Sequence, residues 1–378
     1  MQSDDRRDLV IVGDPQSRRM PLLLDAAQRQ GFDANVVSYQ DRHRIVFPNG
    51  VETLVRLESP GDSPLVARHI LKAGMAPMEQ SGRRPIGEAT IDALTFGRGE
   101  MIHPLQWYLG FQQILQSIQS DWQTKPVRWM NTPAAIATAF DKQVCLDRWA
   151  AADLPIAPGY PGIKTYSQLR STITDKHARV FIKLRYGFSA MGAVALEWRG
   201  DLVRAITTAE VEWHAGRPRL FVSKRPRLLN REFEIAWLID TLAMEEIIVE
   251  DWIPKARWRG KPFDLRIVTI GGVAHHVVGR ANDSPFSNLN LDAVRIDRQD
   301  VADHLGDAWP HVLQLAEQAA SHISDGYLGM DILVRPCRKR CVVLEANAFG
   351  DNLPRLLYEG ETTYDTEMRC SAGMPSLT

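Results

Sequence analysis

The chain has 378 residues, of which 44% are hydrophobic and 24% are charged. This composition is typical of a folded globular protein, and at roughly 150 residues per domain the length predicts two or three domains. The 45 Lys and Arg residues nearly balance the 46 Asp and Glu residues, and the resulting formal charge of −1 does not indicate nucleic acid or a membrane as a partner.

The beginning of the chain, MQSDDRRDLVIVGD, reaches a polar turn before it could form the apolar core of a secretory signal. Since no later apolar run is long enough to predict a membrane-spanning helix, we expect a cytoplasmic protein. The four cysteines, Cys145, Cys337, Cys341 and Cys370, do not predict a disulfide framework in so long a chain. Cys337 and Cys341 bracket the basic turn RKR, where a hairpin is favoured over a metal site.

The first elements in chain order predict a strand, a loop and a helix. Residues 8–12 form an apolar run that ends at Gly13, and PLLLDAAQRQG has helical spacing with a glycine at its end. The loop between them, GDPQSRR, lacks the GxGxxG pattern, so a dinucleotide site is not predicted there. A stretch rich in Pro, Gly and Arg precedes a helical pattern over 103–122, and we place an N-terminal α/β domain at residues 1–125.

Helices and strands then follow in two groups. Thr132 can cap a helix that has Pro133 at its first position, and helical spacing resumes through Trp149. Strand-like runs begin at Val180, a helix is predicted at 231–243, and further strands end with YLGMDILV and CVVLEAN. This order predicts an α+β region of two lobes, at residues 126–248 and 249–360, with a tail at 361–378.

Three polar residues accompany the last two predicted strands: Asp331, Glu345 and Asn347. Glu345 and Asn347 point to one face, because side chains alternate along a strand. On paired strands the three would supply the oxygen ligands that Mg²⁺ prefers, with Mn²⁺ as an alternative. A solvated sheet face is the competing interpretation, but the dense apolar flanks predict burial, where unpaired carboxylates are costly. We therefore predict a metal site.

Lys183 lies near the end of one of the strand-like runs, VFIKL, and precedes RYGFSAMG, a loop of small residues that contains Ser189 and Gly192. Backbone N–H groups of such a loop can bind phosphate oxygens, and a nearby lysine adds positive charge. The competing interpretation is a plain β-hairpin.

Taken in order, these motifs resemble those of the ATP-grasp superfamily. The series is Lys142, Lys183 with its loop, Glu250 to Ile253, Asp264 with Arg266, Arg280, Asn288 with Asn290, Asp331, and Glu345 with Asn347. The likeness covers about residues 131–350, and FSNLN at 286–290 is most similar to the glutamate ligases that modify a ribosomal protein and to glutathione synthetase. It implies an α/β N-terminal (pre-ATP-grasp) domain and an α+β two-lobed ATP-grasp domain.

The resemblance also implies roles for individual residues. It assigns the nucleotide to Lys142, Lys183, Ser189, Gly192, Glu250, Asp251 and Ile253, and catalysis to Arg266, Arg280 and Asn288. Ile253 would offer its N–H and Asp251 its carbonyl to the adenine. A solvated helix lysine is the alternative for Lys142, and a surface salt bridge is the alternative for Arg280. Many relatives place an acidic residue that contacts the ribose hydroxyls shortly after this hinge, whereas this chain has Lys255. The sequence therefore does not decide between ATP and GTP as the nucleotide.

We predict an ATP-dependent ligase that joins a carboxylate to an amine through an acyl phosphate and releases ADP and phosphate. ATP and Mg²⁺ would be required, and the carboxylate and amine would belong to small molecules or peptides. An ATP-binding regulatory or scaffolding protein of the same fold is the alternative, and a different phosphotransfer enzyme is a third. The sequence allows a homodimer without fixing the oligomeric state, and it identifies neither substrate.

A basic run lies outside these motifs. It consists of Arg217, Arg219, Lys224, Arg225, Arg227 and Arg231, with no acidic residue between them. A solvated face is the usual explanation of such a run. The alternative is a surface for an anionic acceptor, such as an acidic peptide, a phosphorylated carrier or RNA.

Overall fold

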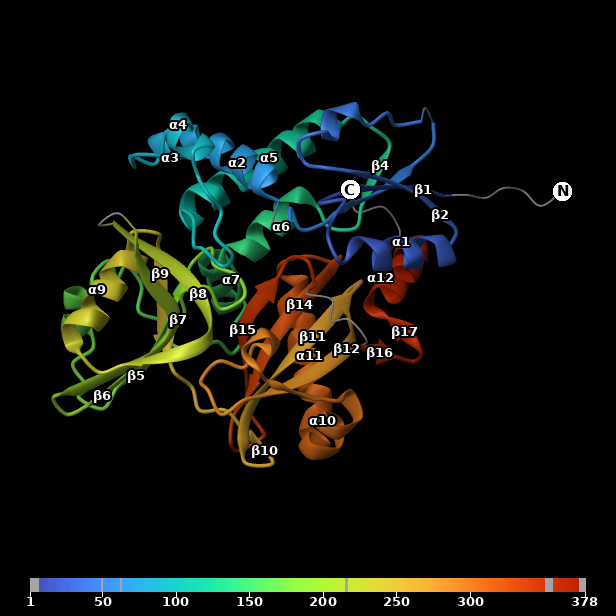
Figure 1. The fold of residues 1–378 in the computed structure, drawn as a ribbon. Coiled ribbons are helices and arrows are strands. Elements are labelled where there is room, and N and C mark those ends of the chain that lie inside the picture. The colour runs from blue at the N-terminus through green and yellow to red at the C-terminus, as the bar shows by residue number, and fades with distance from the viewer. Residues whose placement is uncertain (1–6, 49, 62, 215–216, 351–355, 374–378) are drawn as a thin grey trace.

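The computed structural model describes residues 7–48, 50–61, 63–214, 217–350 and 356–373, which form an N-terminal domain, a lid lobe and a C-terminal lobe (Figure 1). Among these residues no helix is both long and apolar enough to cross a membrane.

The N-terminal domain is built on a parallel sheet of order β2-β1-β3-β4. Its strands are β1 (Arg7–Val12), β2 (Phe32–Val37), β3 (Thr53–Leu57) and β4 (Val127–Trp129), and its helices are α1 (Met20–Arg29), α2 (Pro64–Ala73), α3 (Met75–Gln80), α4 (Glu88–Asp92) and α5 (Pro104–Trp122). Alternate β1 residues face opposite sides: Val10 and Val12 join the core beneath α2 and α5, while Leu9 and Ile11 join the core beneath α1. Because β4 pairs with β3, this sheet extends past residue 125, where we had expected the domain to end.

Two helices connect this domain to the rest, α6 (Pro133–Phe140) and α7 (Lys142–Ala151). Thr132 caps α6 by accepting from the Ala135 N–H, as predicted. The helical pattern is interrupted at Asp141, which has extended backbone angles and whose carboxylate accepts from the first N–H groups of α7. This interruption places Lys142 at the start of α7.

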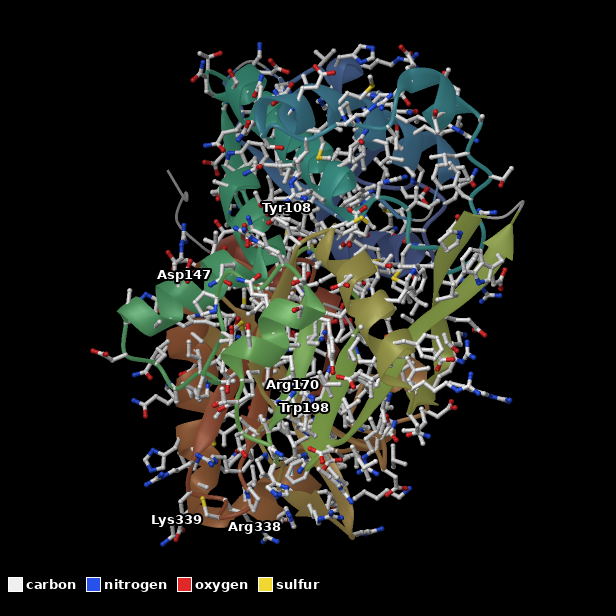
Figure 2. The ribbon with its side chains drawn as sticks, turned by 90° about the vertical axis from the view of Figure 1, so that its left-hand side faces the viewer. Tyr108, Asp147, Arg170, Trp198, Arg338 and Lys339 are labelled. Carbon is white, nitrogen blue, oxygen red and sulfur yellow. The ribbon has the colours of Figure 1, made fainter. Side chains whose placement is uncertain are left out.

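The lid lobe is a five-stranded antiparallel sheet of order β8-β7-β6-β5-β9, with helices on one face. Its elements are α8 (Tyr166–Thr172), β5 (Arg179–Leu184), β6 (Val194–Arg199), β7 (Leu202–His214), β8 (Arg217–Leu229), α9 (Glu232–Ala243) and β9 (Ile247–Asp251). On the helical face the Arg170 guanidinium lies 5.3 Å from the centre of the Trp198 ring (Figure 2).

The C-terminal lobe is an antiparallel sheet of order β13-β12-β11-β14-β15, with β10 paired to β11. Its strands are β10 (Arg257–Trp258), β11 (Lys261–Ile270), β12 (Val273–Ala281), β13 (Val294–Ile296), β14 (Tyr327–Val334) and β15 (Cys341–Asn347), and its helices are α10 (Arg298–Leu305) and α11 (Trp309–Ser321). The turn between β14 and β15, marked by Arg338 and Lys339 in Figure 2, is the hairpin predicted for Cys337 and Cys341. Both cysteines are free thiols.

The segment that we expected to be a tail is partly structured. After a hairpin of β16 (Leu357–Tyr358) and β17 (Glu361–Thr362), helix α12 (Thr363–Gly373) packs against α1. Tyr364 and Met368 of α12 are buried in the core that also holds Leu9 and Ile11. The helix therefore belongs to the folded body, since it covers an apolar face of the N-terminal domain; residues 374–378 of the expected tail lie outside the described part.

Candidate functional site

A cavity of about 320 Å³ lies where the three parts of the molecule meet. A smaller cavity of about 100 Å³ adjoins it and shares several of its walls, including Lys142, Arg280, Asp331 and Glu345. The larger volume is in the range of small-molecule and cofactor sites, which begins at about 300 Å³. All but one of the residues to which we assigned site roles line one or both cavities.

The predicted metal-binding residues lie together on β14 and β15. Asp331 is opposite Glu345, and Asn347 is opposite Gly329, whose carbonyl accepts from Asn347 Nδ2 at 3.0 Å. The amide oxygen of Asn347 is thereby left as an acceptor. No group of three or more His, Cys, Asp or Glu side chains suited to a metal occurs in the described part of the chain, and this trio contains only two. Two carboxylates and an amide oxygen nonetheless fit the oxygen preference of Mg²⁺.

The two predicted arginines flank Asp331 on the same sheet face. Arg266 Nε lies 2.5 Å from one Asp331 oxygen, and Arg280 Nη2 lies 3.2 Å from the other. Arg280 also donates to Asp264 at 2.8 Å. Since Arg280 is only 5% exposed, the alternative of a surface salt bridge is wrong. Arg266 and Arg280 both line the larger cavity, where they can contact an anion.

The two predicted lysines reach the cavities from other parts. Lys142 Nζ donates to the Gly187 carbonyl and lies 3.2 Å from Glu345, and its side chain is 10% exposed, so it is not an ordinary solvated helix lysine. Lys183 is paired with Glu250 across β5 and β9. Burial lowers the pKa of Lys183, but Glu250, Glu345 and Asp331 together raise it by more, and the net shift upward keeps the ammonium charged.

The loop that follows Lys183 has an unusual backbone. Ser189 and Ala190 have positive φ values of 52° and 58°, which are uncommon for residues with a Cβ. Thr208 holds the loop by donating to the Ala190 carbonyl and accepting from the Ala193 N–H. Ser189 lines the larger cavity, as expected for a phosphate loop. Gly192 lines neither cavity and instead packs against Leu242, where an added Cβ would come within 2.9 Å.

The predicted hinge forms one wall of the smaller cavity. Glu250, Asp251 and Ile253 line it, together with the apolar side chains of Leu333 and Leu344 on β14 and β15, and Ile253 packs in one cluster with both leucines. The Asp251 side chain accepts from the Tyr160 hydroxyl at 2.8 Å. An apolar slot beside a strand end that carries backbone donors and acceptors suits a flat heterocycle.

The loop FSNLN joins the two lobes. Phe286 is buried between them and contacts Phe181 of the lid edge to edge, with ring centres 5.8 Å apart. This anchor places Asn288 and Asn290 on the wall of the larger cavity.

Sequence reasoning missed several residues of the site. Lys255, which we noted only as a departure from the family, lines the smaller cavity and donates to Asp264 at 2.8 Å and to Ser287 at 2.7 Å. Burial raises the pKa of Asp264, but Arg280, Lys255 and Ser287 together lower it by more, so the pKa lies well below its ordinary range. The position of Lys255, two residues after the predicted hinge, could have indicated its place in the site. Nothing in the sequence indicated that Arg19 and Trp107 would line the larger cavity.

No protein-family model matches the sequence, and no curated protein matches it. Solved structures do match. One, of the ATP-grasp ligase PsnB complexed with a minimal precursor, has a TM-score of 0.52 and 16% identity over 97% of this chain and 98% of that chain. Another, a RiPP-associated ATP-grasp ligase of Chryseobacterium gregarium in complex with ADP and a leader and core peptide, has a TM-score of 0.53 and 13% identity over 98% of both chains.

At these identities the likeness shows the fold alone. A third match, PsnB complexed with a phosphomimetic variant of the minimal precursor, Mg and ADP, has a TM-score of 0.51 and 14% identity over 96% of this chain and 97% of that chain. The likeness to glutamate ligases and glutathione synthetase stays a prediction. The structural neighbours are ATP-grasp ligases, and the chain has the ATP-grasp fold.

Proposed function

We propose that this protein is an ATP-dependent ligase that activates a carboxylate as an acyl phosphate and transfers the acyl group to an amine. The observation that carries the proposal is a set of buried and partly buried cations around two joined cavities. They are Lys142, Lys183, Lys255, Arg266 and Arg280. Each is paired with a carboxylate, and together they could exchange those partners for the oxygens of a triphosphate.

The adenine would occupy the apolar smaller cavity beside Ile253, and the phosphates would extend past Lys183 and Lys142 toward the larger one. Asp331, Glu345 and Asn347 would hold Mg²⁺, which neutralises phosphate charge and makes the terminal phosphoryl group more electrophilic. Mn²⁺ is a chemical alternative for the same oxygen ligands, and GTP remains a competing donor.

The proposed reaction has two displacements. A carboxylate oxygen of the substrate attacks the γ-phosphorus, and the bond to the β–γ bridging oxygen breaks to release ADP. The amine then attacks the acyl carbon, loses a proton, and displaces inorganic phosphate. Arg266 and Arg280 would hold the transferred phosphoryl group, with Asn288 as an additional donor. Positioning and charge neutralisation suffice, so no protein nucleophile is required.

We also propose a peptide as one of the substrates, because one solved structure that resembles this chain is a complex with a leader and core peptide. Strand β8 offers Lys224, Arg225 and Arg227 as exposed cations, and Trp213 of β7 and Phe233 of α9 are exposed large apolar side chains on the same lobe. An acidic peptide with apolar residues would complement this surface. A merely solvated face is the alternative.

Two other members of the basic run differ from these three. Arg219 is paired with Glu100 of the N-terminal domain, so it is less suited to such a partner. Arg231 lies beyond the end of β8, 3.6 Å from Glu234, and Arg227 of β8 makes a similarly long ion pair of 3.7 Å with Glu210. The Arg217 side chain lies outside the described part. The surface that we propose is therefore shorter than the run 217–231 predicted from the sequence.

The test is an ATP turnover assay over a panel of carboxylates and amines, including acidic peptides, with mass detection of products. The proposal predicts ADP, phosphate and an amide in equal amounts, formed only when Mg²⁺ is present. Nucleotide-dependent binding of a partner without ADP formation would instead favour the scaffolding alternative. Formation of AMP and pyrophosphate would contradict an acyl phosphate. ATP as the phosphoryl donor also fits a cytoplasmic protein.

A further inference from the structure

The larger cavity has a second basic side, formed by the N-terminal domain. Arg19 lies between β1 and α1, and the Ser59–Gly61 turn follows β3; both line the cavity. The strands β1 and β3 are neighbours in the parallel sheet, and the chain continues from β1 to β2 on one side and from β3 to β4 on the other. Open parallel sheets bind ligands at such a reversal point, outside the carboxyl ends of the strands.

A buried carboxylate lies beside Arg19. Glu58 is 1% exposed and accepts from Arg56 Nη2 at 2.8 Å and from the Ser59 N–H at 2.9 Å. Arg19 Nη1 lies 3.6 Å from Glu58, close enough for charge attraction but beyond hydrogen-bond length. The Arg19 side chain is 33% exposed. Its guanidinium carries five N–H donors in a fork that matches a carboxylate.

The two loops at this end of the sheet are fixed against each other. Gly61 has a φ of +73°, and a Cβ there would lie 2.5 Å from an oxygen of Asp14 in the loop after β1. The basic side of the cavity therefore has a defined shape, because the turn and the loop that carries Arg19 pack closely.

The same cavity has an aromatic wall, whose side chains come from helices α5 and α6, the loop that follows Lys183 and the residues after β15. It consists of Trp107, Phe140, Phe188 and Phe349. The ring centres of Trp107 and Phe140 are 6.1 Å apart, and those of Phe140 and Phe349 are 5.6 Å apart. The cavity thus combines the cations of the C-terminal lobe, the cation of the N-terminal domain and an apolar wall.

We propose that Arg19 and the Ser59–Gly61 turn bind a second carboxylate of the acyl substrate. The substrate class is a diacid with an apolar group between its carboxylates, such as a peptide with two acidic residues. One carboxylate is activated beside Arg266, and Arg19 holds the other. This assignment rests on the proposed ligase function, since that function decides which carboxylate reacts.

A structural role for Arg19 makes a different prediction. Arg56, Glu58 and Glu367 form a buried cluster of one guanidinium and two carboxylates, which Arg19 could neutralise. In that case loss of Arg19 would lower stability and weaken all substrates equally. A substrate contact instead weakens only substrates that carry the second carboxylate.

The experiment measures binding by calorimetry to the full-length protein with Mg²⁺ and a non-hydrolysable ATP analogue. The probes are N-acetylated, C-amidated Glu-Leu-Glu and its two isosteres, Glu-Leu-Gln and Gln-Leu-Glu. We expect the wild type to bind the diacid at least about tenfold more tightly than either monoacid, as for one charged hydrogen bond. In Arg19→Gln this advantage should disappear, while Arg18→Gln, which removes an adjacent exposed charge, should keep it.

Three results would overturn the subsite: no preference for the diacid in the wild type, an undiminished preference in Arg19→Gln, or weaker binding of the ATP analogue by that variant. If Arg19→Gln does not fold, Arg19→Lys keeps the charge beside Glu58 and should still reduce the preference. Added ATP and hydroxylamine separate the two proposals. If the protein prefers the diacid through Arg19 but forms neither hydroxamate nor ADP, the ligase proposal alone is refuted. If hydroxamate forms but the protein shows no Arg19-dependent preference for the diacid, the carboxylate subsite alone is refuted.

Discussion

Two clusters of buried charge in this protein have different consequences. The sealed cluster, Arg56, Glu58 and Glu367, has side chains that are at most 1% exposed, and Arg56 lies 4.2 Å from the centre of the Tyr327 ring. The cavity cluster, Asp264, Arg266, Arg280 and Asp331, is almost as buried, but three of its four members line the larger cavity. Burial and ion pairing alone therefore do not identify a functional site; access to a ligand does.

The sealed cluster joins parts of the chain that are far apart in sequence. Arg56 of β3 is paired with Glu367 of α12, 311 residues later. The cavity cluster joins neighbouring strands of one sheet, and its charges can exchange partners when an anion enters. The first arrangement should therefore control stability and the second should control turnover.

Breaking the sealed cluster should have the largest effect on folding. Arg56→Gln removes the buried cation that Glu58 and Glu367 share, and removing one partner of a buried pair typically costs about 3–5 kcal/mol. We expect a loss of this size in the free energy of unfolding, measured by urea denaturation. Arg18→Gln, an exposed control, should change stability little. A stable Arg56→Gln protein would show that the cluster does not hold α12 to the sheet.

Glu345→Gln should produce the opposite result, with stability retained and turnover lost. Its side chain is 22% exposed and lies 3.2 Å from Lys142, which also keeps its bond to Gly187. Loss of a charged metal ligand should lower kcat/KM by about 10²- to 10³-fold. Near-normal activity across a Mg²⁺ titration would place the metal elsewhere, and the exposed Glu359→Gln variant serves as control. Asp331→Asn is a less specific test of the metal site, because it also removes the negative charge that pairs with Arg266 and Arg280.

Lys183→Ala should weaken nucleotide binding by a smaller amount. A charged hydrogen bond to phosphate is typically worth about 1.5–3 kcal/mol, and calorimetry with ATP and Mg²⁺ can measure the difference. Lys176→Ala removes an exposed lysine that precedes the same strand and should leave the affinity unchanged. Equal affinities for wild type and Lys183→Ala would mean that the phosphates bind at another position.

Replacement of Lys224, Arg225 and Arg227 with Ser should have the smallest effect. Exposed charge contacts are typically worth about 0.2–1 kcal/mol each. With three contacts at the low end of that range, we expect the KM of an acidic peptide to rise by about threefold to tenfold and that of ATP to stay constant. Added salt should reproduce the change, because exposed charges are screened over about 8 Å at physiological ionic strength. Replacing Arg338, Lys339 and Arg340 with Ser is the matched control (Figure 2). If both triple variants behave like wild type, strand β8 is a solvated face.

The same contrast explains what could be predicted from the sequence. The strands that carry Asp331 and Glu345 can be predicted from the sequence because apolar residues are dense around them, and the two residues pair as expected. The ion pairs of the sealed cluster cannot be predicted from the sequence, since no local pattern relates Arg56 to α12. Likewise, the short strand β4 and the bridge between Glu100 and Phe221 depend on contacts between distant segments.

The central claim, that a substrate carboxylate attacks the γ-phosphorus of ATP, has a direct chemical test. A carboxylate that supports ADP release is labelled with a heavy oxygen isotope, and the released phosphate is analysed by mass spectrometry. Attack by the carboxylate transfers one labelled oxygen to phosphate when the amine displaces it, so we predict singly labelled phosphate in amounts equal to the amide. Unlabelled phosphate, or label found in AMP, would contradict the proposed mechanism.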